Sequence, residues 1–262
     1  MNLAQLAYRV NDLSIWKQGI HVWGYDMRAC NGDRFLNLCL HRFGLMGSAP
    51  RQTFETILRP GFTAVDVGAN QGLYSLLFAS LVGPQGRVFS FEPDAALFAA
   101  LRENCQRNRA ENISSFNCAI GARAETRTLY RSRVNSGDNR LAASDWSDWF
   151  YEIDIRTETL DSVLGNAHVD FIKIDVQGWE FEVVKGMAEV WNLNPALSIY
   201  FEFWPFGLRR AACEPLQLLD YFRQHGFTLC GIVGSDARPI DNFESFCSAL
   251  QGYKSTNMGS RS

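Results

Sequence analysis

Acidic and amide side chains recur in this sequence at or near the ends of predicted strands. The first group spans residues 66–70, and single residues follow later strands: Glu92, Asn117, Asp175 and Glu202. Because ligands bind outside the carboxyl ends of the strands in open α/β sheets, these side chains would line one polar site, with carboxylates able to accept hydrogen bonds or protons. A cap or turn role for each, common for Asp and Asn, is the alternative interpretation.

A glycine turn follows the first of these strands. Residues 62–67 form an apolar, β-branched run typical of a buried strand, Gly68 and Gly72 open a turn, and the leucines from Leu73 to Leu81 recur at helical spacing. Glycines let a ligand approach the main chain, and the N–H groups of a first helical turn have no intrahelical partner. The segment is therefore either a ligand site or a plain strand–helix turn of an α/β protein.

The glycine spacing bears on the kind of ligand. A dinucleotide fold needs G-x-G-x-x-G to receive a pyrophosphate, whereas the spacing here is G-x-x-x-G with Asp66 in front of it. This form resembles motif I of class I S-adenosylmethionine (SAM) methyltransferases, whose cofactor has no phosphate. Glu92, at the end of the next strand, can accept hydrogen bonds from both hydroxyls of an adenosine ribose, which NAD and SAM share. The spacing thus favours SAM, and an NAD(P)-dependent oxidoreductase is the weaker alternative.

A lysine in the fourth of these strands needs a partner. Alternation over residues 169–175 places Lys173 and Asp175 on one face of a strand that should be buried on both faces. A buried ammonium without a partner is costly, so we predict an ion pair of Lys173 with Asp66, Asp175 or Glu202. The lysine then either anchors a fixed network or polarises a substrate hydroxyl.

The alternation of strands and helices from residue 62 onward is typical of a parallel sheet covered by helices. We predict an N-terminal extension over residues 1–60 that packs on the main domain, an α/β domain over 61–251, and a polar, flexible tail over 252–262. The extension should hold short strands or a hairpin within 16–28 and a helix over 51–58. Later strands are predicted over 113–120, 126–132, 151–157, 197–203 and 227–233, and later helices over 94–108, 159–164, 179–191 and 215–224.

Composition excludes several classes of protein. The chain has 262 residues, 47% of them hydrophobic, and can bury a substantial core. A net charge of −3 gives no general attraction to nucleic acid or anionic membranes. The sequence shows no signal peptide and no apolar run long enough for a membrane span. Seven cysteines without a C-x-x-C pair indicate neither a zinc site nor a disulfide framework, and favour a reduced, cytoplasmic protein.

A long polar loop is predicted over residues 133–150. Loops of this length are uncommon unless they are functional or disordered. Trp146 and Trp149, with Asp145 and Asp148, could stack on a sugar ring and bind its hydroxyls, and Gly137 is a hinge candidate. We predict an acceptor-side lid. Packing of the tryptophans within the lid, or at a subunit interface, is the alternative.

Three motifs, in order along the chain, carry a resemblance to a known family. They are Asp66-Val-Gly-Ala-Asn-Gln-Gly72 with Tyr74-Ser75, then Phe91-Glu-Pro93, then Phe171-Ile-Lys-Ile-Asp-Val-Gln-Gly-Trp-Glu180. Over about residues 16–233 the chain resembles the FkbM family of SAM-dependent methyltransferases. The resemblance implies an α/β class I (Rossmann-like) methyltransferase fold with a doubly wound, mostly parallel, seven-stranded sheet. It also implies methyl transfer to oxygen, on hydroxyls of natural products or of sugars in glycans.

The resemblance also implies roles for individual residues. The methionine end of SAM would be lined by Asp66, Gly68, Asn70, Gly72 and Ser75, its ribose by Glu92, and its adenine by Asn117, Cys118 and Ala119. The wider cofactor-binding set adds Ala69, Tyr74, Pro93 and Asp175.

The reaction itself requires alignment and removal of a proton, because methyl transfer to an alcohol is an in-line displacement. Asp175 and Glu180 are the best candidates to orient or deprotonate the acceptor, with Lys173 and Glu202 completing the catalytic set. The family usually has Glu where this chain has Gln177, which removes a charge beside Asp175. Three acids could hold Mg²⁺, but Gln177 argues against a metal, and we predict none.

The sequence as a whole predicts a cytoplasmic SAM-dependent O-methyltransferase that releases S-adenosylhomocysteine. Its partner would be a small-molecule or glycan hydroxyl, with no nucleic acid and no membrane span. A SAM-binding scaffold protein without turnover is the alternative from another class. The oligomeric state stays open, and a homodimer is compatible with the sequence.

Overall fold

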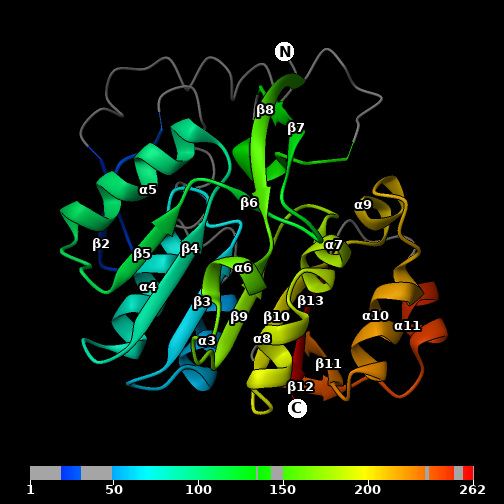
Figure 1. Ribbon diagram of the computed structural model, residues 1–262. Coiled ribbons are helices and arrows are strands. Elements are labelled where there is room, and N and C mark those ends of the chain that lie inside the picture. The colour runs from blue at the N-terminus through cyan, green and yellow to red at the C-terminus, as the bar shows by residue number, and fades with distance from the viewer. Residues whose placement is uncertain are drawn as a thin grey trace.

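The structure is a computed structural model that describes residues 19–30, 49–133, 135–142, 150–233, 236–250 and 256–261. Within these ranges the central sheet has eight strands in the order β12-β11-β13-β10-β9-β3-β4-β5, and helices cover both of its faces (Figure 1). The predicted α/β class I fold is confirmed. The sheet has one strand more than the predicted seven. The strands over 236–239 and 256–261 have no counterpart among the predictions, and the strands predicted over 126–132 and 151–157 belong to a separate sheet.

Five neighbouring strands form the parallel half of the sheet. They are β3 (Thr63–Val67), β4 (Arg87–Phe91), β5 (Ile113–Phe116), β9 (Phe171–Ile174) and β10 (Ser198–Phe203). Each pairs in parallel with its neighbour, so their carboxyl ends meet at one edge of the sheet. This edge holds the polar strand ends that the sequence predicts.

The other half of the sheet is antiparallel. It consists of β11 (Thr228–Val233), β12 (Asp236–Pro239) and β13 (Thr256–Arg261), with β13 between β10 and β11. The prediction of a flexible tail over 252–262 is therefore wrong for the residues of β13. Their polar composition gives no strand signal, whereas main-chain pairing with two neighbours does not depend on apolar side chains.

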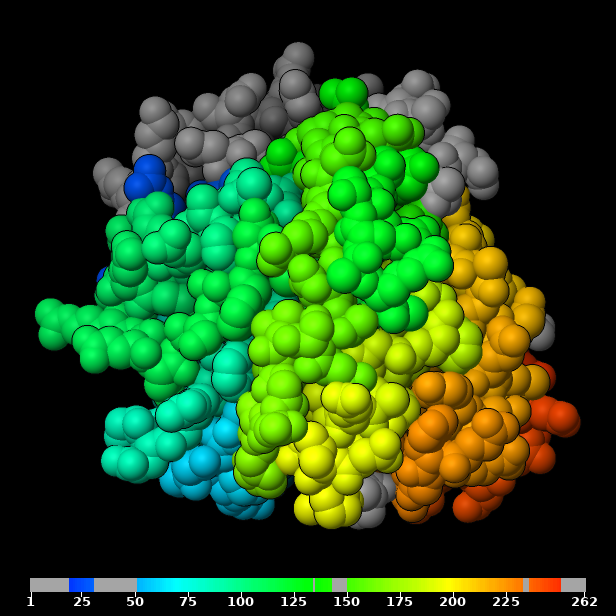
Figure 2. All heavy atoms as spheres, in the orientation of Figure 1, coloured from blue at the N-terminus to red at the C-terminus, as the bar shows by residue number. Residues whose placement is uncertain are grey.

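Alternate residues of the parallel strands belong to two cores. In β9, Phe171 packs with Phe54 of helix α3 (Ala49–Ile57) and Phe78 of α4 (Leu73–Val82). Ile172 belongs to the core on the opposite face, with Val183 of α7 (Glu180–Lys185). That second face is also covered by the helices α6 (Leu160–Leu164), α8 (Ala188–Leu193) and α10 (Pro215–Gln224). In the space-filling view, green, yellow and orange side chains close over this face (Figure 2).

The helix predicted over 179–191 is wrong as a single element. The chain leaves the helical path at Gly186 and Met187 and divides the segment into α7 and α8. Gly186 lies against the carbonyl of Gly121, where any Cβ would overlap the oxygen. The helix breaks where two main-chain segments must touch, which hydrophobic periodicity does not register. The remaining helices of the described ranges are α5 (Ala95–Arg107), α9 (Pro205–Arg210) and α11 (Phe243–Ala249).

A second sheet of three strands stands above the carboxyl edge. It contains β6 (Ala119–Ile120), β7 (Glu125–Ser132) and β8 (Phe150–Glu158) in the order β6-β8-β7. The strand predicted over 113–120 is therefore wrong as one strand, because its first part is β5 and its last two residues pair with β8. The short 3-10 helix η2 (Ser136–Asp138) follows β7. The predicted lid residues Asp145, Trp146, Asp148 and Trp149 lie outside the described residues.

The described part of the N-terminal extension packs on the main domain. The hairpin of β1 (Ile20–Val22) and β2 (Tyr25–Met27) buries Val22 and Met27 against Leu73 and Leu76 of α4. Asn104 of α5 accepts the Arg28 N–H at 2.7 Å. The predicted hairpin and the helix predicted over 51–58 are both confirmed. Across the described ranges, none of the helices has the length and apolar composition that a membrane crossing requires.

Candidate active site

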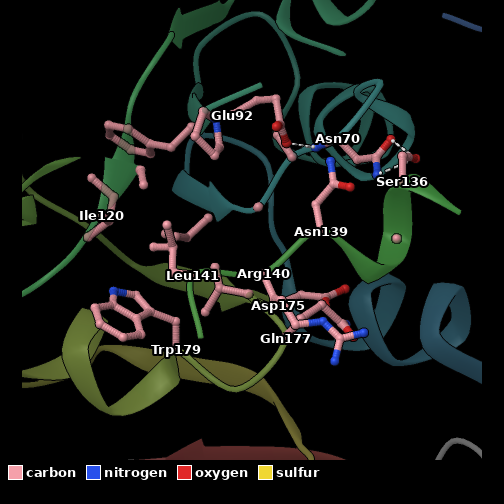
Figure 3. A pocket seen from close by; sticks show the side chains of 18 of the residues that line it. Asn70, Glu92, Ile120, Ser136, Asn139, Arg140, Leu141, Asp175, Gln177 and Trp179 are labelled. Carbon is pink, nitrogen blue, oxygen red and sulfur yellow. Dashed lines mark hydrogen bonds between the residues drawn. The ribbon is translucent and has the colours of Figure 1, made fainter. Parts of the chain in front are cut away.

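A cavity of about 330 Å³ opens at the carboxyl ends of β3, β4, β9 and β10, within the range of roughly 300–1,000 Å³ common for ligand pockets. The second sheet and the segment from Asn135 to Leu141 form its other wall. Figure 3 shows that the cavity has two unlike halves. Ile120, Leu141 and Trp179 stand at one end, and polar side chains stand at the other.

The glycine turn brings two loops together beneath this cavity. Gly68 has a φ of +79° and lies so close to Asp175 that a Cβ would overlap the Asp175 carbonyl oxygen. Only glycine allows this conformation and this contact without strain. Gly72 packs against Leu101 of α5 and does not line the cavity. The two glycines of the motif therefore have different roles. Gly68 shapes the cavity floor, and Gly72 allows helix α5 to pack closely against the turn.

Glu92 occupies the boundary between the two halves of the cavity. Its side chain is 5% exposed, and its two carboxylate oxygens accept the N–H groups of Asn70 at 2.8 Å and of Asp94 at 2.9 Å. Burial raises the pKa of Glu92 to about 8, although these N–H groups act in the opposite direction. Each carboxylate oxygen has a further lone pair, so the group can still accept two hydroxyl hydrogens.

The apolar half suits a flat, weakly polar ring. Ile120, Leu141 and Trp179 stand at this end (Figure 3), and the cavity lining also includes the apolar residues Phe91, Cys118, Ala119 and Leu129. Arg127 stacks over the Trp179 indole at 4.5 Å. Asn117 does not line this half, because its amide donates to the carbonyls of Glu92 and Pro93 at 2.8 and 3.0 Å and so holds the turn after β4.

The polar half contains the ion pair that the sequence predicts. Lys173 Nζ lies 3.1 Å from Asp66 Oδ1 and 3.6 Å from Asp175 Oδ2. The side chains of Lys173 and Asp66 are 2% and 0% exposed, and Ser75 donates to Asp66 at 2.7 Å. Burial alone would lower the pKa of Lys173, but the carboxylates of Asp66 and Asp175 raise it above its ordinary value. Asp66 and Ser75 therefore support the site from behind, while Lys173 reaches the cavity.

Glu180 does not enter the cavity. It is fully buried, and Oε1 accepts the N–H groups of Val176 at 3.3 Å and Gly178 at 3.2 Å. Burial raises the pKa of Glu180 to about 7. The structure thus places Glu180 as the brace of the loop after β9, and the prediction that it reaches the acceptor finds no support in this placement.

Most of the predicted site residues nevertheless meet around one cavity. Those that line it are Gly68, Ala69, Asn70, Tyr74, Glu92, Pro93, Cys118, Ala119, Lys173, Asp175 and Glu202. Those that lie behind its walls are Asp66, Gly72, Ser75, Asn117 and Glu180. In the described part of the chain, no three His, Cys, Asp or Glu side chains are grouped so that they could hold a metal ion.

Sequence reasoning missed the residues that the segment after β7 brings to the cavity. Ser136 accepts a hydrogen bond from the Asn70 amide at 3.0 Å, which joins the segment to the glycine turn. Arg140 is 4% exposed, forms an ion pair with Asp138, and stacks over Phe150 at 4.6 Å. An available signal was the Asn-Ser-Gly run at 135–137, in which Asn135 caps η2 by accepting the Gly137 N–H.

A match to a protein-family model identifies the family of the chain that contains this cavity. Residues 66–229, more than half of the chain, match the model of the methyltransferase FkbM domain. The chain belongs to the FkbM methyltransferase family. It is a SAM-dependent methyltransferase, and the oxidoreductase and scaffold alternatives are set aside.

The chain is also similar to several known proteins and solved structures. The chain is 32% identical to the 31-O-demethyl-FK506 methyltransferase FkbM of Streptomyces tacrolimicus over 161 residues, which is 50% of this chain and 62% of that protein. It is 29% identical to the 2-O-methyltransferase NoeI of Sinorhizobium fredii over 170 residues, 58% of this chain and 68% of that protein. A SAM-dependent methyltransferase from Aquifex aeolicus superposes with a TM-score of 0.45 and 15% identity, covering 80% of this chain and 87% of that one.

The cavity of this FkbM family member fits SAM. Glu92 offers a carboxylate to a ribose diol, and the apolar half offers a slot to the adenine ring. The absence of a Cβ at Gly68 lets the main chain of Asp175 pack against the glycine turn, so that both loops line the polar half. A cofactor with a flat, weakly polar ring at one end and a charged amino acid at the other matches this division.

The raised pKa of Glu92 predicts that SAM binding depends on pH. In the free protein the carboxyl is mostly protonated below about pH 8, whereas two ribose hydroxyls favour the ionised form. The affinity for SAM should therefore rise by up to about 25-fold between pH 6.5 and 8.5, as the ionised fraction of Glu92 increases. Calorimetry across this range checks the prediction, and Glu92→Gln should bind more weakly and lose this part of the pH dependence. Equal pH profiles for the two proteins would show that the ribose lies elsewhere.

Proposed function

We propose that this methyltransferase transfers the methyl group to the oxygen of a hydroxyl on a small molecule, either a natural-product alcohol or a sugar of a glycan precursor. The observation that carries the proposal is the pair of carboxylates, Asp175 and Glu202, at the polar end of the cavity that holds the cofactor-binding residues. Methyl transfer to a hydroxyl needs such a group to orient the acceptor and take its proton. The names of the relatives FkbM and NoeI, both O-methyltransferases, agree with this chemistry.

SAM, when bound, supplies a methyl group on a sulfonium. In our proposal Glu92 holds the ribose, the apolar half holds the adenine, and Gly68 to Asn70 face the methionine end. Asp175 follows β9, lines the polar end of the cavity and is 37% exposed. Lys173 fixes one oxygen of this carboxylate from below. Asp175 is then placed to orient the acceptor hydroxyl and to receive its proton.

The acceptor side is bounded by elements that differ in character from the cofactor side. Gln177 donates a hydrogen bond to Asp175, and Arg140 lines the same polar end of the cavity (Figure 3). Trp204 directly follows β10, and the guanidinium carbon of Arg140 lies over its ring, 5.6 Å from the ring centroid. An acceptor that enters here meets hydrogen-bonding groups, which suit a hydroxylated molecule more than a long alkyl chain.

Incubation with methyl-labelled SAM and a panel of sugar nucleotides, oligosaccharides and natural-product alcohols tests the proposal. We expect label in a product that resists the mild base which cleaves methyl esters, since an ether would have formed. Label found only in amines or carboxylates would contradict O-methylation. SAM binding by calorimetry, run in parallel, shows that the protein used is competent.

The contact between Asn70 and Ser136 predicts that the segment after β7 helps to retain the cofactor. Ser136→Ala removes one acceptor from the Asn70 amide, so the dissociation constant for SAM should rise about three- to tenfold, the scale of one hydrogen bond. Ser114→Ala, at an exposed position of β5, is the matched control. An unchanged dissociation constant in Ser136→Ala would show that the segment does not cover bound SAM.

We also propose that the enzyme works in the reducing cytoplasm. Cysteines of the described ranges carry free thiols, and they are Cys30, Cys105, Cys118, Cys213, Cys230 and Cys247. Burial raises the pKa of Cys105 to about 11, so its thiol is a poor nucleophile at neutral pH. These thiols serve as small apolar side chains, which agrees with a compartment where disulfides do not form.

A further inference from the structure

The amide of Gln177 lies between the two carboxylates of the acceptor end. Its Nε2 donates to Asp175 Oδ1 at 3.1 Å and to Glu202 Oε2 at 2.6 Å. A primary amide has two N–H donors on this nitrogen, and both are used here. One neutral side chain thus connects the ends of β9 and β10.

The two strands bring these carboxylates together whether or not they attract each other. β9 and β10 pair in parallel with Ile174 opposite Phe201, so the next residues, Asp175 and Glu202, are neighbours across the strands. Two carboxylates this close repel each other unless a donor or a cation lies between them. Lys173 contacts Asp175 from one side only, at 3.6 Å, and already pairs with Asp66. The second oxygen of Asp175 therefore depends on Gln177.

The main chain at Gln177 is held in a conformation that glycine favours. Its φ is +54°, a left-handed conformation that costs a side-chain-bearing residue free energy. Glu180 fixes the turn on both sides, through the N–H groups of Val176 and Gly178. The protein maintains a strained turn at this position, and the turn aims the amide at Asp175 and Glu202.

We propose that Gln177 is a positioning residue for methyl transfer: its amide holds Asp175 and Glu202 as a pair at the acceptor end and makes that pair independent of a bound divalent cation. The role rests on the proposed function, since it concerns the carboxylates that orient the acceptor. A glutamate at 177 would place a third carboxylate beside the other two. Hard cations such as Mg²⁺ bind groups of carboxylate oxygens, so that change should convert an amide-held pair into a cation-held triad.

Two substitutions separate these roles. Gln177→Met keeps the length of the side chain and removes both donors, and Gln177→Glu keeps the shape and exchanges the donors for a charge. The matched control is Gln85→Glu, because Gln85 is exposed in the turn between α4 and β4, at the opposite edge of the sheet. Each protein is assayed with labelled SAM and the acceptor that the panel identifies, in buffer with EDTA and in buffer with millimolar MgCl₂. The dissociation constant for SAM is measured in parallel.

We expect wild type and Gln85→Glu to turn over equally in the two buffers. Gln177→Met should lower kcat about ten- to hundredfold in both buffers, with SAM affinity changed less than about threefold. The kcat of Gln177→Glu should be lowered to a similar extent in EDTA, and it should rise about tenfold when MgCl₂ is present. A wild-type enzyme that loses activity in EDTA would overturn the proposal, as would a Gln177→Met enzyme with wild-type kcat.

A titration without acceptor keeps the inference separate from the proposed function. Calorimetry with MgCl₂ on the folded proteins should give binding heat with Gln177→Glu and none with wild type. Binding by wild type, or by neither protein, would overturn the role of Gln177 whatever the acceptor is. If wild type binds SAM but methylates no member of the panel, the proposed function fails, and this titration still decides whether the amide stands in place of a cation.

Discussion

Asp175→Asn is expected to lower kcat by about 10²–10⁴-fold, the range for a positioned acid or base. The substitution keeps the shape of the side chain and removes the charge that orients the acceptor and receives its proton. Asp175 lines the cavity and is 37% exposed, so the change acts at the cavity and not in the hydrophobic core. The affinity for SAM should change by less than about threefold, because Glu92 and the apolar half remain intact. Steady-state kinetics with SAM calorimetry on the same protein measure both quantities.

The outcome of this experiment distinguishes two roles of Asp175. Loss of SAM affinity with an unchanged kcat at saturation would assign the carboxylate to the cofactor, and full activity with normal affinity would remove it from the site. Asp154→Asn, at an exposed position of β8 that does not line the cavity, controls for the loss of one negative charge. That variant should match the wild type in both measurements.

Sequence reasoning worked best where one short segment determines both fold and site. The strand, glycine turn and helix around Gly68 are local, and the parallel strands bring Glu92 and Asp175 to the same edge. The pairing of Lys173 followed from burial and charge alone, without any knowledge of the partner's position. In these places local pattern and chemistry indicate the same structure.

The parts that sequence reasoning missed depend on contacts between distant segments. Helix α7 ends because Gly186 meets Gly121, and β13 forms because two other strands leave a position between them. Ser136 and Arg140 reach the cavity from an irregular segment, which has no periodicity to analyse. The prediction for Glu180 failed for a related reason. Glu180 is close to Asp175 in the sequence, but its carboxylate accepts a hydrogen bond from the main chain of the loop and does not face the cavity.

Lys173→Met is expected to destabilise the protein by about 3–5 kcal/mol, the cost of leaving a buried charge without its partner. Methionine retains most of the volume and contacts of the lysine stem, so cavity formation contributes little. What remains is the Asp66 carboxylate, 0% exposed, with the Ser75 hydroxyl at 2.7 Å. The raised pKa of Lys173 means that its contribution is complete at neutral pH and is lost only as the pH rises into the alkaline range, through that raised pKa. Thermal and urea unfolding at pH 7 therefore measure all of it.

A double substitution shows whether the effect arises from charge. Asp66→Asn combined with Lys173→Met removes both charges. The double mutant should therefore regain at least about half of the stability that Lys173→Met alone loses. Lys185→Met, at an exposed position of α7, should change stability by less than about 0.5 kcal/mol. A Lys173→Met protein with wild-type stability but no activity would contradict the anchoring role. Because Lys173 Nζ reaches the cavity and contacts Asp175, that result would place the ammonium in the methyl-transfer chemistry itself.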